Sequence, residues 1–270
     1  MLRAGLLRHR LILIPVVAAA AAVSALSVAA PAAAQSSANY VALGDSYSSG
    51  VGAGNYSDGS CDQSSNAYSA LWAKANDPSS YVTETCSGAT TSSVISSQLS
   101  ALSASTTLVS ITVGGNDVGF SSVMETCVIF STSDCVSAVD TAENEVAADL
   151  PGELNSVLGD IAADAPNARV VVLDYPDLYD LSRSSSCIGL STTDRTDLNQ
   201  AADILDGVIQ TQAQDYGYTY VDIRPYFAGH EICDSNSWLH SVNFLDIDES
   251  YHPTASGQED AYYPALEAGV

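Results

Sequence analysis

The sequence has 270 residues, of which 46% are hydrophobic and 15% charged, and its 32 acidic and 8 basic side chains give a formal net charge of −24. This length is typical of one domain or two. So acidic a chain repels phosphate backbones and anionic lipid headgroups, and it contains a single lysine, Lys74. Nucleic-acid binding and nucleoside-triphosphate hydrolysis are therefore not expected, and we interpret most of the acidic residues as a solvated surface.

The first 34 residues differ in composition from the rest. Three arginines within the first ten positions precede an apolar stretch from Leu11 to about Ala30, and Ala32–Ala34 supplies the small residues that precede a cleavage site. We interpret residues 1–34 as a signal peptide and residues 35–270 as a secreted, extracellular domain with no stable membrane insertion after cleavage. The alternative is an uncleaved anchor, because about 20 apolar residues can span a bilayer.

In the remaining chain, short runs rich in Val, Ile and Tyr alternate with Ala-rich helical stretches. This pattern predicts a parallel sheet with crossover helices, an α/β fold. We expect a flavodoxin-like, three-layer α/β/α sandwich with about five parallel strands. The predicted strands are Tyr40–Leu43, Tyr81–Thr85, Leu108–Val113, Arg169–Asp174 and Tyr218–Ile223. The predicted helices are Asn66–Asn76, Ser92–Leu102, Val136–Ala163 divided near Pro151, Thr193–Gln214, and a last helix that begins at Pro253 and runs towards Ala268.

Six cysteines occur in this exported chain, and none forms a C-x-x-C pair. Three disulfides are the expectation, although six cysteines allow 15 pairings. We favour pairing in sequence order, because each bridge would then close a loop between neighbouring elements. The favoured pairs are Cys61–Cys86, Cys127–Cys135 and Cys187–Cys233.

Polar residues follow the first three predicted strands, at the edge of an open parallel sheet where functional groups collect. A hydroxyl comes from Ser46, a flexible backbone amide from Gly88 and a carboxamide from Asn116, while His252 supplies an imidazole near the carboxyl end. A nucleophile, a base and hydrogen-bond donors are the parts of an acyl-transfer site.

These blocks resemble those of the SGNH (GDSL-type) hydrolases, in particular the secreted bacterial three-disulfide lipases and esterases, a likeness that also supports the sequential cysteine pairing. The matching blocks are Val41–Ser48, Ser87–Gly88, Gly114–Asp117 and His252–Pro253. The resemblance implies that Ser46 is the nucleophile and His252 the general base. It also implies that the oxyanion is bound by the backbone N–H groups of Ser46 and Gly88 and by the Asn116 amide.

One position departs from the family pattern. The last block of the family is usually Asp-x-x-His, with the Asp orienting the imidazole, but Glu249 stands three residues before His252. Either the Glu249 carboxylate or the backbone carbonyl of Ser250 would orient the ring. We favour the carbonyl, which gives a Ser46/His252 dyad and fixes the tautomer without adding a full negative charge.

Other interpretations of the same residues are structural. Ser46 could cap a helix, and Asp45 would hold its loop by backbone hydrogen bonds. His230 and His240 are rival bases, and Gly50–Gly54 is predicted to be a mobile loop beside the site. Asp246 and Asp248 are interpreted as part of a solvated loop, and we expect no metal and no cofactor.

We therefore predict a secreted serine ester hydrolase, a lipase or carboxylesterase, that acts as a monomer on small-molecule or lipid esters. The scarcity of basic residues favours neutral esters. The alternatives are a phospholipase or a carbohydrate deacetylase with the same site, or a secreted binding protein without turnover.

Overall fold

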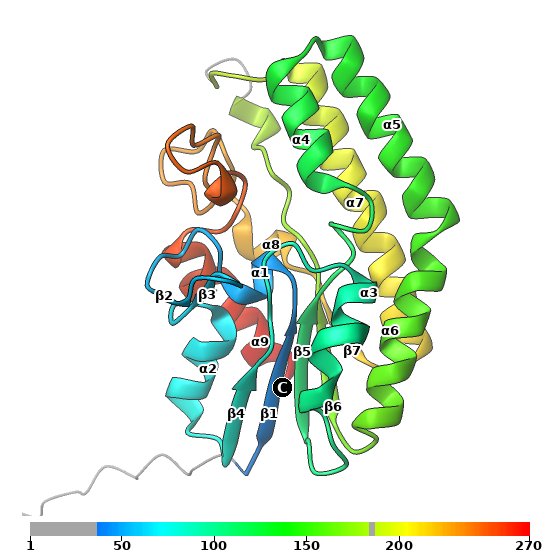
Figure 1. Cartoon of the computed structure of the whole chain (residues 1–270). Coiled ribbons are helices and arrows are strands. Elements are labelled where there is room, and N and C mark those ends of the chain that lie inside the picture. The colour runs from blue at the N-terminus through cyan, green and yellow to red at the C-terminus, as the bar shows by residue number, and fades with distance from the viewer. Residues whose placement is uncertain (1–36, 184–186) are drawn as a thin grey trace, which may run out of the picture. The chain divides into compact units, whose positions relative to one another are not determined.

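The central sheet contains five parallel strands in the order β4-β1-β5-β6-β7 (Figure 1). This computed structural model describes residues 37–183 and 187–270, so the predicted signal peptide lies outside the described residues. No helix in these two ranges is long and apolar enough to cross a membrane. The strands are β1 (Asn39–Gly44), β4 (Ser80–Thr83), β5 (Leu108–Thr112), β6 (Arg169–Leu173) and β7 (Thr219–Val221). Each overlaps a predicted strand, and every neighbouring pair is parallel, as expected.

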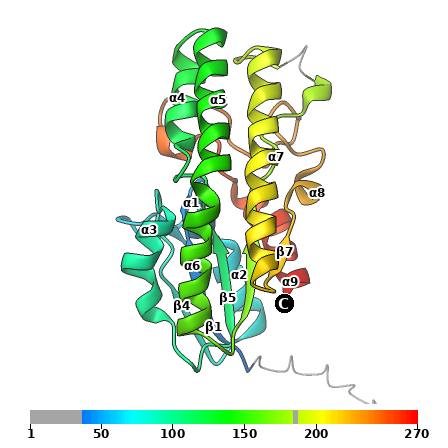
Figure 2. The ribbon, with the colours of Figure 1, turned by 90° about the vertical axis from the view of Figure 1, so that its right-hand side faces the viewer.

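Helices cover both faces of this sheet, which confirms the three-layer architecture (Figures 1 and 2). One face carries α2 (Tyr68–Asn76), the π-helical turn η5 (Gly257–Tyr262) and α9 (Tyr263–Gly269). The other carries α3 (Thr91–Ser93), α6 (Leu150–Asp164) and α7 (Thr192–Asp215). The middle strands are buried accordingly: every residue of β5 is buried, and so is every residue of β6 after Arg169. Within this core the Tyr40 and Ser110 hydroxyls form a hydrogen bond with each other at 2.7 Å.

Two further helices stand beyond the carboxyl ends of the strands. They are α4 (Phe120–Ile129) and α5 (Thr132–Ala148). The sequence periodicity did not predict α4, and α5 begins after Ser131, which forms a capping box with Asp134. The expected division near Pro151 is confirmed, since α5 ends at Ala148 and Pro151 lies in the first turn of α6.

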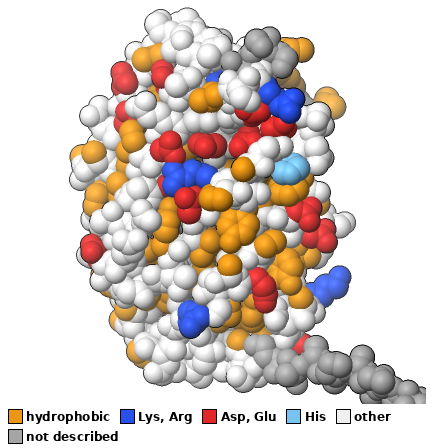
Figure 3. All heavy atoms as spheres, turned by 180° about the vertical axis from the view of Figure 1, so that it is seen from behind, with side chains coloured by type: hydrophobic (Ala, Val, Ile, Leu, Met, Phe, Trp, Pro, Cys, Tyr) orange, Lys and Arg blue, Asp and Glu red, His pale blue; other side chains and the backbone are white. Residues whose placement is uncertain are grey.

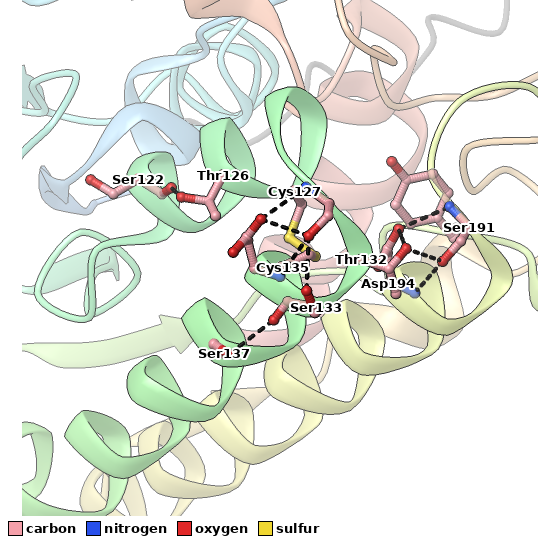
Figure 4. The surroundings of a disulfide bond; sticks show 12 residues. Ser122, Thr126, Cys127, Thr132, Ser133, Cys135, Ser137, Ser191 and Asp194 are labelled. Carbon is pink, nitrogen blue, oxygen red and sulfur yellow. Dashed lines mark hydrogen bonds between the residues drawn. A yellow bond between two sulfur atoms is a disulfide. The ribbon is translucent and has the colours of Figure 1, made fainter.

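The three disulfides join the expected cysteine pairs. The Cys127–Cys135 bridge ties α4 to α5, and Thr132 at the start of α5 bonds to Asp194 of α7 at 3.3 Å (Figure 4). The three helices α4, α5 and α7 are therefore fastened together at one end.

Two predicted helices differ from the structure, and one short pair of strands was not predicted. The helix expected at Ser92–Leu102 is divided into α3, a π-helical turn η1 (Val94–Gln98) and a 3-10 turn η2 (Leu99–Ala101). The last helix does not begin at Pro253, because Pro253 forms an isolated bridge with Leu239 and helical structure starts at Ala255. Residues 56–64, for which no element was predicted, contain a short antiparallel pair, β2 (Tyr56–Asp58) and β3 (Gln63–Ser64).

The shorter elements are α1 (Ser46–Ser49), α8 (Arg224–Phe227), and the 3-10 turns η3 (Leu181–Arg183) and η4 (Ile247–Glu249). On the face seen in Figure 3, Asp and Glu side chains lie beside the basic groups in the upper half of the view. This distribution agrees with the excess of acidic residues in the sequence.

Candidate active site

Ser46 begins α1 immediately after β1, on a turn that only glycine permits. Gly44 has φ +120°, and a Cβ at this position would lie 2.2 Å from the Thr112 carbonyl oxygen. Asp45 then caps α1 by accepting a hydrogen bond from the Tyr47 N–H at 3.0 Å. Ser46 is 7% exposed, so its hydroxyl is held in a largely enclosed place at the end of the sheet.

The structure brings Ser46 and His252 together across 206 positions of the chain. Ser46 Oγ lies 2.7 Å from His252 Nε2, while Nδ1 of the same ring lies 3.0 Å from the Ser250 carbonyl oxygen. A carbonyl can only accept a hydrogen bond, so Nδ1 carries the ring proton. Nε2 is then an acceptor aimed at the Ser46 hydroxyl, which is the arrangement of a nucleophile and a neutral general base.

The Glu249 carboxylate has a different partner from the imidazole. It accepts a hydrogen bond from the Tyr56 hydroxyl at 2.9 Å, and the same hydroxyl accepts the Gly52 N–H at 2.9 Å. Glu249 thereby links η4, which precedes His252, to the β2 strand and to the Gly52 backbone.

The glycine-rich segment after α1 lies beside the site, as predicted, and its middle residues are packed against other parts of the protein. Val51, Gly52 and Ala53 are buried. The Gly52 carbonyl accepts a hydrogen bond from His240 Nε2 at 2.8 Å, and a Cβ on Gly52 would lie 3.2 Å from the His252 Cβ. This segment therefore packs closely against His240 and the Cβ of His252.

Enclosure changes the acid–base properties of His252. Removal from water lowers its pKa to about 4, because burial penalises the imidazolium, while the Ser250 carbonyl opposes this shift. The ring is thus neutral over the whole physiological range of pH.

Gly88 and Asn116, the two other predicted site residues, belong to loops that are bonded to each other. Asn116 Nδ2 donates to the Ala89 carbonyl at 3.0 Å, and Asp117 accepts the Thr91 N–H at 3.0 Å. The amide of Asn116 keeps a second N–H, and Gly88, at φ +76°, donates its backbone N–H to no described residue. Asn116 also lines the same pocket as Ser46.

Asp45 has a larger structural role than the expected loop cap. Its carboxylate accepts hydrogen bonds from the Thr112 hydroxyl at 2.6 Å and from the Tyr175 hydroxyl at 2.5 Å, as well as from the backbone. Burial raises its pKa to about 6, and these hydrogen bonds limit the shift. The sequence analysis did not identify Thr112 and Tyr175 as partners of Asp45, although both lie at or just after the ends of buried strands whose following loops were predicted to form the site.

An apolar pocket opens at Ser46. Its cavity volume is about 70 Å³, and it continues into a wider space that is open to solvent. Its walls come from the loop after β5, from α4, α5 and α7, and from the segment after β6. Its apolar side chains include Val118, Phe120, Val123, Val146, Leu198 and Leu205.

The rival histidines have other partners. His230 stacks on Trp238 with 3.5 Å between the ring centroids and bonds to the Asn236 carbonyl, and His240 bonds to Gly52 as described above. Across residues 37–183 and 187–270, no group of three or more His, Cys, Asp or Glu side chains is arranged to hold a metal ion.

Comparison with known proteins assigns the chain to a family. The sequence pattern of the GDSL-like Lipase/Acylhydrolase family matches residues 42–259, which include Ser46, Asn116 and His252. The chain belongs to this family. It is accordingly a carboxylic ester hydrolase with the SGNH-type α/β/α fold that the sequence predicted.

Similarity to individual members of this family covers most of the chain. "Lipase 1" of Streptomyces coelicolor is 51% identical over 257 residues, which are 94% of this chain and 95% of that protein. The crystal structure of a phospholipase A1 from Streptomyces albidoflavus is 52% identical, with a TM-score of 0.83 over 86% of this chain and 98% of that one. The structure of an extracellular lipase from Streptomyces rimosus also has a TM-score of 0.83, at 45% identity, over 86% of this chain and 99% of that one.

The geometry around Glu249 predicts that its carboxylate is dispensable for proton transfer. We expect Glu249→Ala to lower kcat/KM for a soluble ester by no more than about tenfold, because the Ser250 carbonyl still holds Nδ1–H. Glu249→Gln, which keeps an acceptor for the Tyr56 hydroxyl, is the matched control. A loss of about 10⁴, the scale seen when the acid of a triad is replaced, would show instead that the carboxylate orients the base.

Proposed function

We propose that this hydrolase cleaves lipid esters with a neutral or zwitterionic head through an acyl-enzyme on Ser46, with His252 as the general base. The observation that carries the proposal is the 2.7 Å contact between Ser46 Oγ and His252 Nε2 at the mouth of an apolar pocket. A hydroxyl beside an acceptor nitrogen supplies the chemistry, and the pocket offers a place for a hydrocarbon chain.

The reaction follows from these positions. Ser46 Oγ attacks the ester carbonyl carbon while Nε2 of His252 takes the hydroxyl proton, and the resulting imidazolium protonates the alcohol as it leaves. Water then attacks the acyl-enzyme, gives its proton to Nε2, and releases the acid with regeneration of the Ser46 hydroxyl. Throughout both steps the Ser250 carbonyl keeps Nδ1–H in place.

Three N–H groups would stabilise the tetrahedral oxyanion: the backbone amides of Ser46 and Gly88 and the second N–H of the Asn116 amide. Support comes from the loop contacts, because Asn116 and Ala89 are bonded at 3.0 Å and Cys86, two residues before Gly88, is bridged to Cys61. Donors held in advance of the reaction need little reorganisation when charge develops.

The pocket and the charge of the chain define the substrate class. An acyl chain would bury its methylenes against the pocket lining, at about 0.8 kcal/mol for each buried CH₂. With 8 basic residues in 270, the chain has few groups to pair with an anionic head. A phospholipid with a zwitterionic head is the favoured second substrate, given the 52% identity to a phospholipase A1. A sugar acetate would leave the apolar pocket unfilled.

We infer that the protein acts outside the cell as a monomer. Three disulfides support an oxidising location, and the S. rimosus relative is an extracellular lipase. The signal peptide at residues 1–34 remains a sequence-based proposal.

Covalent labelling tests the nucleophile. An alkyl phosphonate directed at active serines is expected to label the wild-type protein at Ser46, and Ser46→Ala should abolish both the label and ester hydrolysis. The control is Ser49→Ala, a neighbouring hydroxyl of α1 that bonds to the Ser46 carbonyl and is not aimed at the imidazole. Labelling that persists in Ser46→Ala would exclude this serine, and an unlabelled, inactive wild type would favour a binding protein.

The acid limb of the pH profile reports on the base. With the pKa of His252 lowered to about 4, kcat/KM for a soluble ester should stay level as pH falls through 6.5 and halve only near pH 4. The sign follows because the protonated ring cannot accept the serine proton. Circular dichroism at each pH separates titration from unfolding. A half-maximal rate near the ordinary imidazole value of about 6.5 would contradict an enclosed base.

Filling the pocket should shorten the preferred acyl chain. Ala201 on α7 lines the pocket, and Ala201→Phe is expected to lower kcat/KM for a dodecanoyl ester at least about tenfold relative to an acetyl ester, because several methylenes lose their contacts. Gly207→Ala, also on α7 but with open space around the new methyl group, is the control. An unchanged chain-length profile would place the acyl group elsewhere.

A further inference from the structure

A cluster of exposed apolar side chains lies on the segment that leads to His252. Phe244 is 82%, Leu245 100% and Ile247 60% exposed. Single exposed apolar residues are normal on a protein surface, but here three large ones lie within four positions, and we call these three side chains the apolar tip. We call residues 243–249 the apical loop.

Hydrogen bonds join the ends of the apical loop to the residues around the imidazole of His252. Asn243 N–H donates to Ser250 Oγ at 2.8 Å, and the His240 N–H donates to the His252 carbonyl at 2.9 Å. Glu249, at the other end of the loop, is held by Tyr56. The two ends of the apical loop are therefore held by hydrogen bonds, and the same bonds hold the backbone around His252.

The apical loop lies at the end of the sheet where the pocket opens, beyond the carboxyl ends of the strands. In Figure 1 this orange segment stands above α1, at the same end of the strands as α4 and α5, whose side chains line the pocket. An acyl chain that leaves an aggregated lipid for the pocket would cross this end of the molecule.

The acidic residues of the apical loop indicate which kind of surface its apolar tip can bind. Asp246 and Asp248 alternate with the apolar residues, and the whole chain carries a net charge of −24. Acidic groups beside an inserting tip repel anionic headgroups and tolerate neutral or zwitterionic ones. A second copy of the chain would bring the same carboxylates face to face.

We propose that the apical loop docks the enzyme on a lipid surface of zwitterionic or uncharged headgroups by inserting Phe244, Leu245 and Ile247. This inference rests on the ester hydrolase function proposed above and adds the physical state of its substrate. Docking would bring the end of the molecule at which the pocket opens towards the lipid that supplies the acyl chain.

Vesicle partition tests the docking apart from catalysis. In a Ser46→Ala background, which leaves the lipid intact, the triple variant Phe244→Ser, Leu245→Ser and Ile247→Ser should bind phosphatidylcholine vesicles at least about tenfold more weakly than the parent, since each apolar side chain loses its burial in the lipid. Val82→Ser, a 40% exposed apolar residue on the edge strand β4, is the matched control and should bind like the parent. Adding phosphatidylglycerol to the vesicles should weaken the binding of the parent.

Turnover provides the second measurement. With Ser46 present, the triple variant should show at least about a tenfold fall in the ratio of its rate on phosphatidylcholine vesicles to its rate on a dissolved acetyl ester. Unchanged partition, or an unchanged ratio, would overturn the proposal, as would a parent that dimerises through the loop and leaves the vesicles unbound. If the parent hydrolyses no ester, the proposed function fails, while partition in the Ser46→Ala background still reports on the loop.

Discussion

The hydrogen bond between Ser46 and His252 depends on almost every other part of the fold. One partner follows the first strand and the other precedes the last helix, so the contact forms only when the sheet and its covering layer are both in place. Two hydrogen bonds between the segment of Ser46 and the C-terminal segment fix this geometry. The Tyr47 hydroxyl donates to the Tyr251 carbonyl at 2.7 Å, and the Gln258 amide donates to the Tyr47 carbonyl at 3.0 Å. Because all these groups are buried, loss of any one would leave an unsatisfied polar atom next to the base.

The buried carboxylate of Asp45 performs the same task for the strand-end loops. Through Thr112 it is joined to β5, and through Tyr175, whose hydroxyl also accepts the Gly115 N–H at 3.2 Å, it is joined to the segment after β6 and to the loop that carries Asn116. A carboxyl group in this place costs free energy through desolvation, as its raised pKa indicates. The hydrogen bonds offset that cost and give the turn that carries Ser46 a fixed position relative to the loop of Asn116.

The sheet and the polar blocks could be predicted because their signals are local. A strand buried on both faces, such as Leu108–Thr112, is a continuous apolar run, and the polar residues that follow it lie at a known edge of the sheet. The pocket could not be predicted, because it depends on how α4, α5 and α7 pack, and α4 gave no clear periodicity. The partner of Glu249 was equally hidden, since Tyr56 lies 193 positions away on a three-residue strand. Pro253 misled for a related reason: a proline suits the first turn of a helix, but here a tertiary bridge to Leu239 holds it extended.

If His252 is the base, as proposed, its orientation by a carbonyl places particular demands on the rest of the site. The Ser250 carbonyl fixes the tautomer of His252 but adds no full charge to balance the imidazolium, and enclosure already disfavours that cation. In the proposed acyl transfer, the negative charge that compensates the imidazolium would come from the oxyanion that develops beside the ring. Its stability depends on donors that are already in place, which gives a reason for the double connection between the Gly88 and Asn116 loops, through Ala89 and through Asp117. In the proposed mechanism, donors held in place on these loops take over the stabilisation that the charge of an aspartate would otherwise supply.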